Sequence, residues 1–232
     1  MLIGVLQLYK NFQNLDFCRK NYIIFSTKEG DAMSIEKEIL DFLADKKSWV
    51  FCIKDVLSFG DYFSVAKALG RLTKKGNIQR LAQGIYYYPL INKLFNLSYP
   101  PEIKDVAEAI ARNNNWDIRE TGNSALYFLG LDNQIPMTFT FLSSGPYRTY
   151  NIDNRTIEFK SSANKNFIFS RKTSLIVQAL KALGKNNIGF NEITKLSNFL
   201  SDNEKEELLK NVTFAPLWMQ KYLKDIGGLN NE

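Results

Sequence analysis

Histidine is absent from the 232-residue sequence, and cysteine occurs only twice, as Cys18 and Cys52. The absence of histidine excludes every mechanism that needs a histidine base, a Ser-His-Asp triad or a histidine metal ligand. Two cysteines are too few for a structural zinc site by themselves, and they fit a reduced cytosolic interior better than a disulfide scaffold. We therefore expect no metal site, no cofactor and a cytoplasmic location.

Long apolar runs are also lacking. No stretch of 18 apolar residues occurs, and the mean hydropathy is −0.24, so a membrane-spanning helix is not expected. Hydrophobic residues nevertheless make up 45% and aromatic residues 13% of the chain, which is enough to fill a core and too much for a disordered chain. The length predicts one or two globular domains.

Positive charge is concentrated in one segment. The formal net charge is +6, and the stretch from Tyr62 to Lys93 contains six basic residues and no acidic residue. Such a concentration is typical of a nucleic-acid-binding segment, and a solvated basic helix face has the same composition. The charge alone therefore does not decide between these two interpretations.

Residues 1–32 differ from the rest, because they show neither a helical nor an alternating apolar period. They match the pattern of a signal peptide poorly, since no basic residue precedes the apolar start and no small-residue cleavage site follows. Met33 is followed by a good helix start, with Ser34 as the cap and Glu36 complementing the helix dipole. We interpret residues 1–32 as a non-native or dispensable extension; an ordinary N-terminal strand or arm is the alternative.

Three helices followed by a two-stranded hairpin are predicted after this extension. The helices are expected at about 34–46, 53–59 and 62–75, the strands at 77–82 and 85–88, and a further short strand at 49–51. Gly76 ends the third helix, and Gln83-Gly84 forms the hairpin turn. This is the order of a winged helix-turn-helix, which we assign to residues 33–90.

A second domain is expected at 98–232, after the boundary at Pro100-Pro101. Its predicted elements are helices at 102–113 and 122–129, strands at 116–118, 137–142, 147–152 and 155–160, and helices at 172–183, 190–199, 203–211 and 214–225. The predicted fold class is α+β: an N-terminal winged helix-turn-helix followed by a mixed α/β domain with a small antiparallel sheet and a helical C-terminal third.

The helix at 62–75 has the two faces that a DNA recognition helix needs. Its apolar stripe consists of Val65, Ala68, Leu69 and Leu72, and its basic residues are centred roughly 120° away. A recognition helix packs one face on the preceding helices and offers the other to the major groove. The predicted DNA contacts, including one from the hairpin, are Ser64, Lys67, Arg71, Lys74, Lys75 and Arg80.

The same region resembles the AbiEi-type antitoxins, winged-helix regulators of phage-abortive-infection and type IV toxin–antitoxin systems. The resemblance rests on Ala66 to Leu81 and Gln83 to Tyr87, and then on Thr121 to Leu131, Gln134-Ile135-Pro136 and Ser144-Gly145-Pro146. The stretches Arg155 to Phe159 and Leu217 to Met219 fit a related, uncharacterised branch. Together they cover about residues 33–225 and leave out 1–32.

This resemblance implies two tasks for a protein that is not an enzyme. The N-terminal domain would bind inverted repeats in the double-stranded DNA of its own promoter and repress its operon. The C-terminal domain would counter a cognate nucleotidyltransferase toxin, as a functional partner. The residues that neutralise the toxin do not follow from the motif.

Two other functions remain as alternatives. Glu158-Phe159-Lys160 has the Glu-x-Lys spacing of some metal-dependent nucleases, with Asp132 and Asp153 as the nearby acidic candidates. We favour an amphipathic strand instead, with Ile157 and Phe159 inward and Glu158 outward, and so predict no catalytic residue. The other alternative is a winged helix that serves only as a protein-interaction adaptor.

Overall fold

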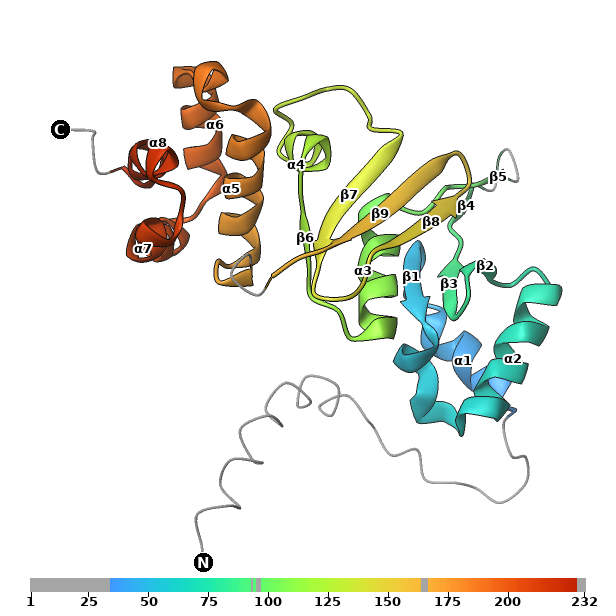
Figure 1. Ribbon diagram of the computed structural model, residues 1–232. Coiled ribbons are helices and arrows are strands. Elements are labelled where there is room, and N and C mark those ends of the chain that lie inside the picture. The colour runs from blue at the N-terminus through green and yellow to red at the C-terminus, as the bar shows by residue number, and fades with distance from the viewer. Residues whose placement is uncertain (1–33, 93, 95–96, 164–166, 229–232) are drawn as a thin grey trace, which may run out of the picture. The chain divides into compact units, whose positions relative to one another are not determined.

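The structure is a computed structural model that describes residues 34–92, 94, 97–163 and 167–228 (Figure 1). Contacts within the chain divide it into the units Met1–Met33 and Ser34–Glu232. The predicted extension at 1–32 therefore lies outside the described residues. The second unit is α+β, with small sheets and a helical C-terminal third, as the sequence predicts.

The first six elements follow the predicted order. They are α1 (Ile35–Leu43), β1 (Trp49–Cys52), η1 (Ile53–Phe59), α2 (Tyr62–Lys74), β2 (Gln79–Ala82) and β3 (Ile85–Tyr88). The second predicted helix is the 3-10 helix η1, which begins where Asp55 accepts a hydrogen bond from the Cys52 amide at 2.9 Å. Gly84, at φ +74°, makes the turn between β2 and β3, a conformation that favours glycine.

The strands β1, β3 and β2 form an antiparallel sheet in that order. Phe51 pairs with Tyr86, and both pack in a core with the apolar sides of α1 and α2. Val50 pairs with Tyr87, and these two side chains belong to a second core on the opposite face of the sheet. The β1–β3 pair is therefore buried on both faces.

Two short strands that the sequence analysis does not predict, β4 (Ile91–Asn92) and β5 (Leu97–Ser98), pair with each other next. The following elements are α3 (Ile103–Asn114), β6 (Ile118–Glu120), α4 (Asn123–Phe128), β7 (Thr138–Ser143), β8 (Arg148–Ile152) and β9 (Arg155–Ser161). Their bounds agree with the predicted helices and strands to within a few residues.

The larger sheet has the strand order β6-β7-β9-β8, and its β7–β9 pair is parallel. The predicted sheet is antiparallel throughout, which holds for the β6–β7 and β8–β9 pairs only. The difference follows from burial: Ile157 and Phe159 on β9 are fully buried, whereas most of β8 is exposed. Strand β9 therefore takes the inner position beside β7, and β8 becomes the edge.

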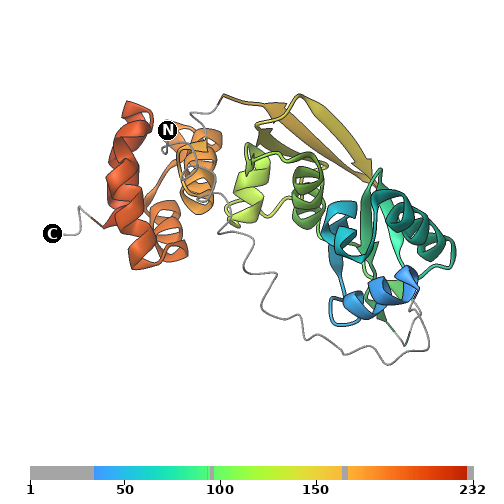
Figure 2. The ribbon, with the colours of Figure 1, turned by 90° about the horizontal axis from the view of Figure 1, so that it is seen from below.

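Helix α3 contacts both sheets. Val106, Ala107 and Ile110 on α3 share one core cluster with Val50 and Tyr87 of the small sheet. The same cluster contains the buried aromatic residues of the larger sheet, which are Phe139, Phe141 and Phe159. Figures 1 and 2 show α3 beside β1. The two domains predicted at 33–90 and 98–232 therefore share this core. Their division into separate domains remains a prediction.

The C-terminal third is helical, as predicted. It comprises α5 (Arg171–Leu183), η3 (Lys185–Asn187), α6 (Phe190–Phe199), α7 (Asp202–Asn211), η4 (Val212–Phe214) and α8 (Leu217–Gly227), drawn from orange to red in Figure 1. These helices share a third core with α4. In the part of the chain that the structure describes, no helix is long and apolar enough to cross a membrane.

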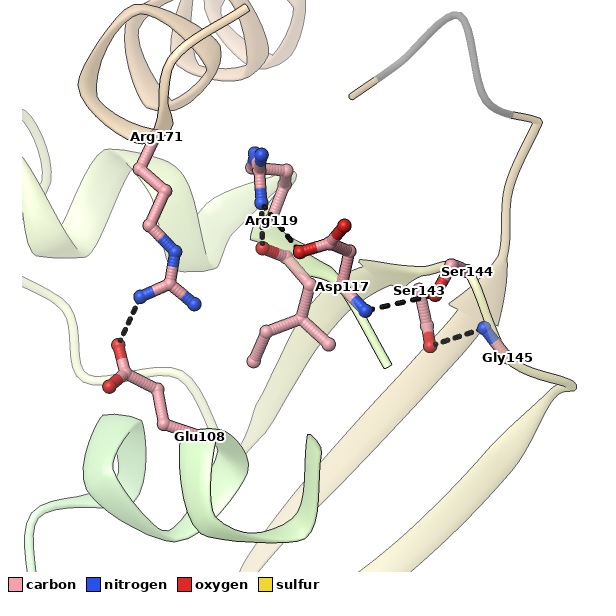
Figure 3. Close-up of polar contacts among 8 residues, drawn as sticks. Glu108, Asp117, Arg119, Ser143, Ser144, Gly145 and Arg171 are labelled. Atoms are coloured by element: carbon pink, nitrogen blue, oxygen red, sulfur yellow. Dashed lines mark hydrogen bonds and ion pairs between the residues drawn. The ribbon is translucent and has the colours of Figure 1, made fainter. Parts of the chain in front are cut away.

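The turn at Ser143-Ser144-Gly145-Pro146 is packed against the start of β6 (Figure 3). The Ser144 hydroxyl accepts a hydrogen bond from the Asp117 amide at 2.9 Å, and the Ser143 hydroxyl accepts one from the Gly145 amide at 3.0 Å. A Cβ atom at residue 145 would lie 2.3 Å from the indole ring of Trp116. Gly145 is therefore required because the turn approaches Trp116 so closely.

We predict that Gly145→Ala lowers the free energy of unfolding by about 1–3 kcal/mol, because the Trp116 ring must move. Urea denaturation followed by circular dichroism measures this change. The matched control is Gly70→Ala in α2, where a Cβ atom meets nothing within 4 Å. That substitution should raise the free energy of unfolding by about 0.5–1 kcal/mol, as alanine does in a helix interior. Equal stabilities of the two variants would contradict the prediction.

Candidate nucleic-acid interface

Helix α2, which carries most of the predicted DNA contacts, has a firmly capped N-terminus. The Asp61 carboxylate accepts hydrogen bonds from the amides of Phe63 at 2.9 Å and Ser64 at 3.1 Å. It also accepts one from the Ser64 hydroxyl at 2.6 Å, and these bonds hold the pKa of Asp61 below its usual value. Ser64, a predicted DNA contact, is therefore engaged in the helix cap.

The two faces of α2 are arranged as predicted. Val65, Ala68, Leu69 and Leu72 are fully buried, and they pack on α1, η1 and the small sheet. The four predicted basic contacts of this helix are all exposed: Lys67, Arg71, Lys74 and Lys75. The buried face fixes the helix, and the basic face is open to solvent.

Glu36 of α1 divides the basic residues into two groups, and the sequence analysis did not foresee this. Its carboxylate forms ion pairs with Arg71 and with Lys75, the latter at 2.6 Å. The Glu36 side chain is only 16% exposed, whereas those of Arg71 and Lys75 are 59% and 62% exposed. The hydrogen bond from Lys75, followed by the contacts with Arg71, lowers the pKa of Glu36. The Glu36 carboxylate thus compensates one of the two positive charges that Arg71 and Lys75 carry.

Lys67 and Lys74 form the second group. Within the described residues neither lysine has an ion-pair partner. Arg80, on β2, is exposed, and its Nε atom donates to the Ala82 carbonyl at 3.4 Å. Lys67, Lys74 and Arg80 are therefore the predicted contacts that pair with no carboxylate of the described residues.

Two exposed aromatic residues lie at the N-terminal end of α2. Phe63 is 75% exposed and Tyr62 is 55% exposed, and their rings contact each other edge to face at 5.8 Å. Neither residue is among the DNA contacts predicted from the sequence. Both residues lie outside the apolar stripe of α2. This position is the sequence signal that could have identified them as exposed aromatic residues.

The three tyrosines of β3 have a packing role. Tyr86 and Tyr87 are buried, in the two cores on opposite faces of the small sheet. The Tyr87 hydroxyl donates to the Tyr99 carbonyl at 2.8 Å. Tyr88 is half-buried. These rings are therefore not platforms on which nucleic-acid bases could stack.

The Thr121 to Leu131 block, on which the family resemblance partly rests, serves packing. Ser124 is buried, and its hydroxyl accepts a hydrogen bond from the Thr140 amide at 2.7 Å. The Thr121 hydroxyl donates to Gln178 of α5 at 2.9 Å. These bonds tie the start of α4 to β7 and α5.

Glu158, the residue of the nuclease alternative, lies on an amphipathic strand. Ile157 and Phe159 are buried, while Glu158 accepts a hydrogen bond from the Tyr147 hydroxyl at 2.7 Å and pairs with Lys160 at 3.3 Å. The Tyr147 bond and the Lys160 contact lower the pKa of Glu158. Among the described residues, no group of three or more potential metal-ligating acids or cysteines occurs. The carboxylate is engaged in local contacts, and Asp153 lies in a turn at φ +50°.

Arg119, which the sequence analysis did not single out, is a buried cation on β6 (Figure 3). It donates to the Ile118 carbonyl at 2.8 Å, and its Nε atom has no hydrogen-bond partner. Burial lowers its pKa, and the nearest carboxylate paired with it, Asp117, is 4.0 Å away. Arg171 of α5 pairs instead with Glu108 of α3 at 3.1 Å. The observed role of Arg119 is to satisfy a backbone carbonyl of the edge strand β6.

Comparison with known proteins identifies a family whose function has not been assigned. Residues 35–208 match the model of the family of unknown function DUF6088, and because the match covers more than half of the chain, the chain belongs to that family. No curated protein matches it. A solved structure, the Rv2827c protein from Mycobacterium tuberculosis, is similar with a TM-score of 0.42 and 15% sequence identity, over 85% of this chain and 78% of that one.

We predict that Glu36→Gln destabilises the protein at pH 7 and that the effect disappears in acid. The pKa of Glu36 is lowered in the folded protein, so its stabilising contribution is present above the unfolded-state pKa of about 4.3 and is lost as the pH falls through the folded value. Thermal denaturation of both proteins between pH 7 and pH 3 measures the difference in melting temperature. Glu38→Gln, a charge change in the same turn of α1, is the control. A difference that persists unchanged at pH 3 would contradict the prediction.

Proposed function

We propose that this protein binds double-stranded DNA and that residues 33–90 are a winged helix-turn-helix with α2 as its recognition helix. The observation that supports this most is that the exposed face of α2 offers Lys67 and Lys74, which have no acidic partner in the part of the chain that the structure describes, while the opposite face of the helix is buried. A helix that is fixed by its core and carries uncompensated positive charge suits the major groove, where phosphates and base edges are both within reach.

The order of elements supports the same proposal. Helices α1, η1 and α2 precede the β2–β3 hairpin, which would be the wing, and β1 completes its sheet. Arg80 lies on this hairpin and is exposed, so it could contact a phosphate beside the groove that α2 enters. The Asp61 cap and the two-sided burial of β1 and β3 hold this unit rigid.

Glu36 changes how this surface would bind. Arg71 and Lys75 attract phosphates less strongly than two unpaired cations would, because they share the Glu36 carboxylate. Lys67 and Lys74 have no such partner among the described residues, and they are therefore the more informative pair to mutate. With about five phosphate contacts, the logarithm of the affinity should fall with the logarithm of the salt concentration at a slope of roughly −4 to −5.

For the cellular role, we propose a transcriptional regulator that is the antitoxin of a toxin–antitoxin module. This rests on the resemblance of residues 33–225 to AbiEi-type antitoxins, which implies autorepression and protection against a nucleotidyltransferase toxin. Protection by the variant Lys67→Ala/Lys74→Ala against a toxin expressed from a separate promoter would assign neutralisation to the C-terminal part. If protection is lost while the variant stays folded, neutralisation of the toxin depends on DNA binding instead.

We predict that Lys67→Ala/Lys74→Ala weakens binding to DNA from the region upstream of its own gene and reduces the salt slope by about 2. Fluorescence anisotropy at several salt concentrations measures both quantities. Lys221→Ala/Lys224→Ala on α8 removes the same charge from exposed positions and should leave binding and slope unchanged. If the two double variants behaved alike, α2 would not be the DNA-binding surface.

A further inference from the structure

We propose that Phe63, Lys67, Gly70 and Lys74 form the line of α2 that faces the floor of the DNA major groove, with Phe63 against the 5-methyl group of a thymine and Gly70 at the closest approach. This proposal rests on the proposed DNA-binding function and specifies which base it reads. We refer to these four residues as the groove line.

The groove line follows from helix geometry. At 100° per residue, the directions of Phe63, Lys67, Gly70 and Lys74 fall within about 60° of one another. All four residues are exposed, and the buried stripe faces the other way. Arg71 and Lys75 lie beyond one edge of this line, toward α1, where Glu36 holds them. The two unpaired lysines are therefore in line with Phe63 and Gly70.

No contact with the described residues explains why position 70 is a glycine. It lies within the helix Tyr62–Lys74, and a Cβ atom there would meet nothing within 4 Å. Other glycines have a reason: Gly145 lies against Trp116, Gly227 lies against Leu209, and Gly84 has a positive φ. Because glycine weakens a helix relative to alanine, its presence here is explained by an external surface that approaches the backbone closely.

Phe63 supplies the base preference. The first turn of a recognition helix contacts base edges, and the thymine methyl is the apolar group that the major groove offers. The Asp61 carboxylate next to Phe63 repels phosphate, and its lone pairs are taken by the amides of Phe63 and Ser64. This end of α2 is therefore unsuited to the DNA backbone, and an aromatic ring that is 75% exposed finds an apolar partner on a base.

The first test removes single methyl groups from DNA. The binding site upstream of the gene is located by footprinting, and each thymine in it is replaced by deoxyuridine, which lacks only the 5-methyl group. At one thymine in each half-site, the replacement should weaken binding of the wild-type protein about fourfold, the value expected for one buried methyl. Phe63→Ala should weaken binding to the thymine site and show no further loss at that position. Equal losses in wild type and Phe63→Ala at every position would overturn the assignment.

The second test uses Gly70→Ala, which should affect stability and binding in opposite directions. The melting temperature should rise, and DNA affinity should fall at least tenfold because the methyl group separates the helix from the groove floor. If the variant is more stable and binds DNA like the wild type, Gly70 does not lie at the contact with DNA.

Phe63 is exposed, so Phe63→Ala should melt like wild type, which separates loss of contact from loss of folding. Absence of DNA binding by the wild-type chain would instead overturn the proposed function, and this inference with it.

Discussion

The burial of β1 and β3 on both faces is the constraint on which the packing of α1, α2, α3 and the larger sheet depends. On one face Phe51 and Tyr86 complete the core that holds α1 and α2, and on the other Val50 and Tyr87 pack with α3 and the larger sheet. Neither strand has a solvent face, so their sequences read as nearly continuous apolar runs, WVFC and IYYY. The orientation of α2 is therefore set by the same two strands that anchor α3.

The ion pairs of α2 distribute its charge in a way that the net charge does not convey. A formal charge of +6 and a basic segment suggest one uniform surface, yet a single carboxylate from α1 pairs with two of its cations and cancels one positive charge. What remains is a narrower line of positive charge beside two exposed aromatic rings. The family to which the chain belongs has no assigned function, so the proposed DNA-binding role is based on the chemistry of this surface.

Local features of the fold could be predicted from the sequence, and long-range ones could not. Caps at Ser34 and Asp61, the glycine turn at Gly84 and the apolar stripe of α2 are properties of neighbouring residues, and the elements they delimit are found. The parallel pairing of β7 with β9 depends on which strand is buried more, and that is decided by the whole core. The ion pairs of Glu36 join residues 35 and 39 positions apart, so no local pattern reveals them. The same holds for the partly unpaired guanidinium of Arg119.

The Glu36 carboxylate has a consequence for the way such a protein would search a genome. On the proposed function, this carboxylate weakens the attraction of Arg71 and Lys75 for any DNA backbone, and the weakening is the same for every sequence. Sequence-independent binding is weakened, while contacts to base edges are unaffected. The protein would then leave non-cognate DNA sooner, and a larger share of its residence time would fall on sites that the groove line recognises.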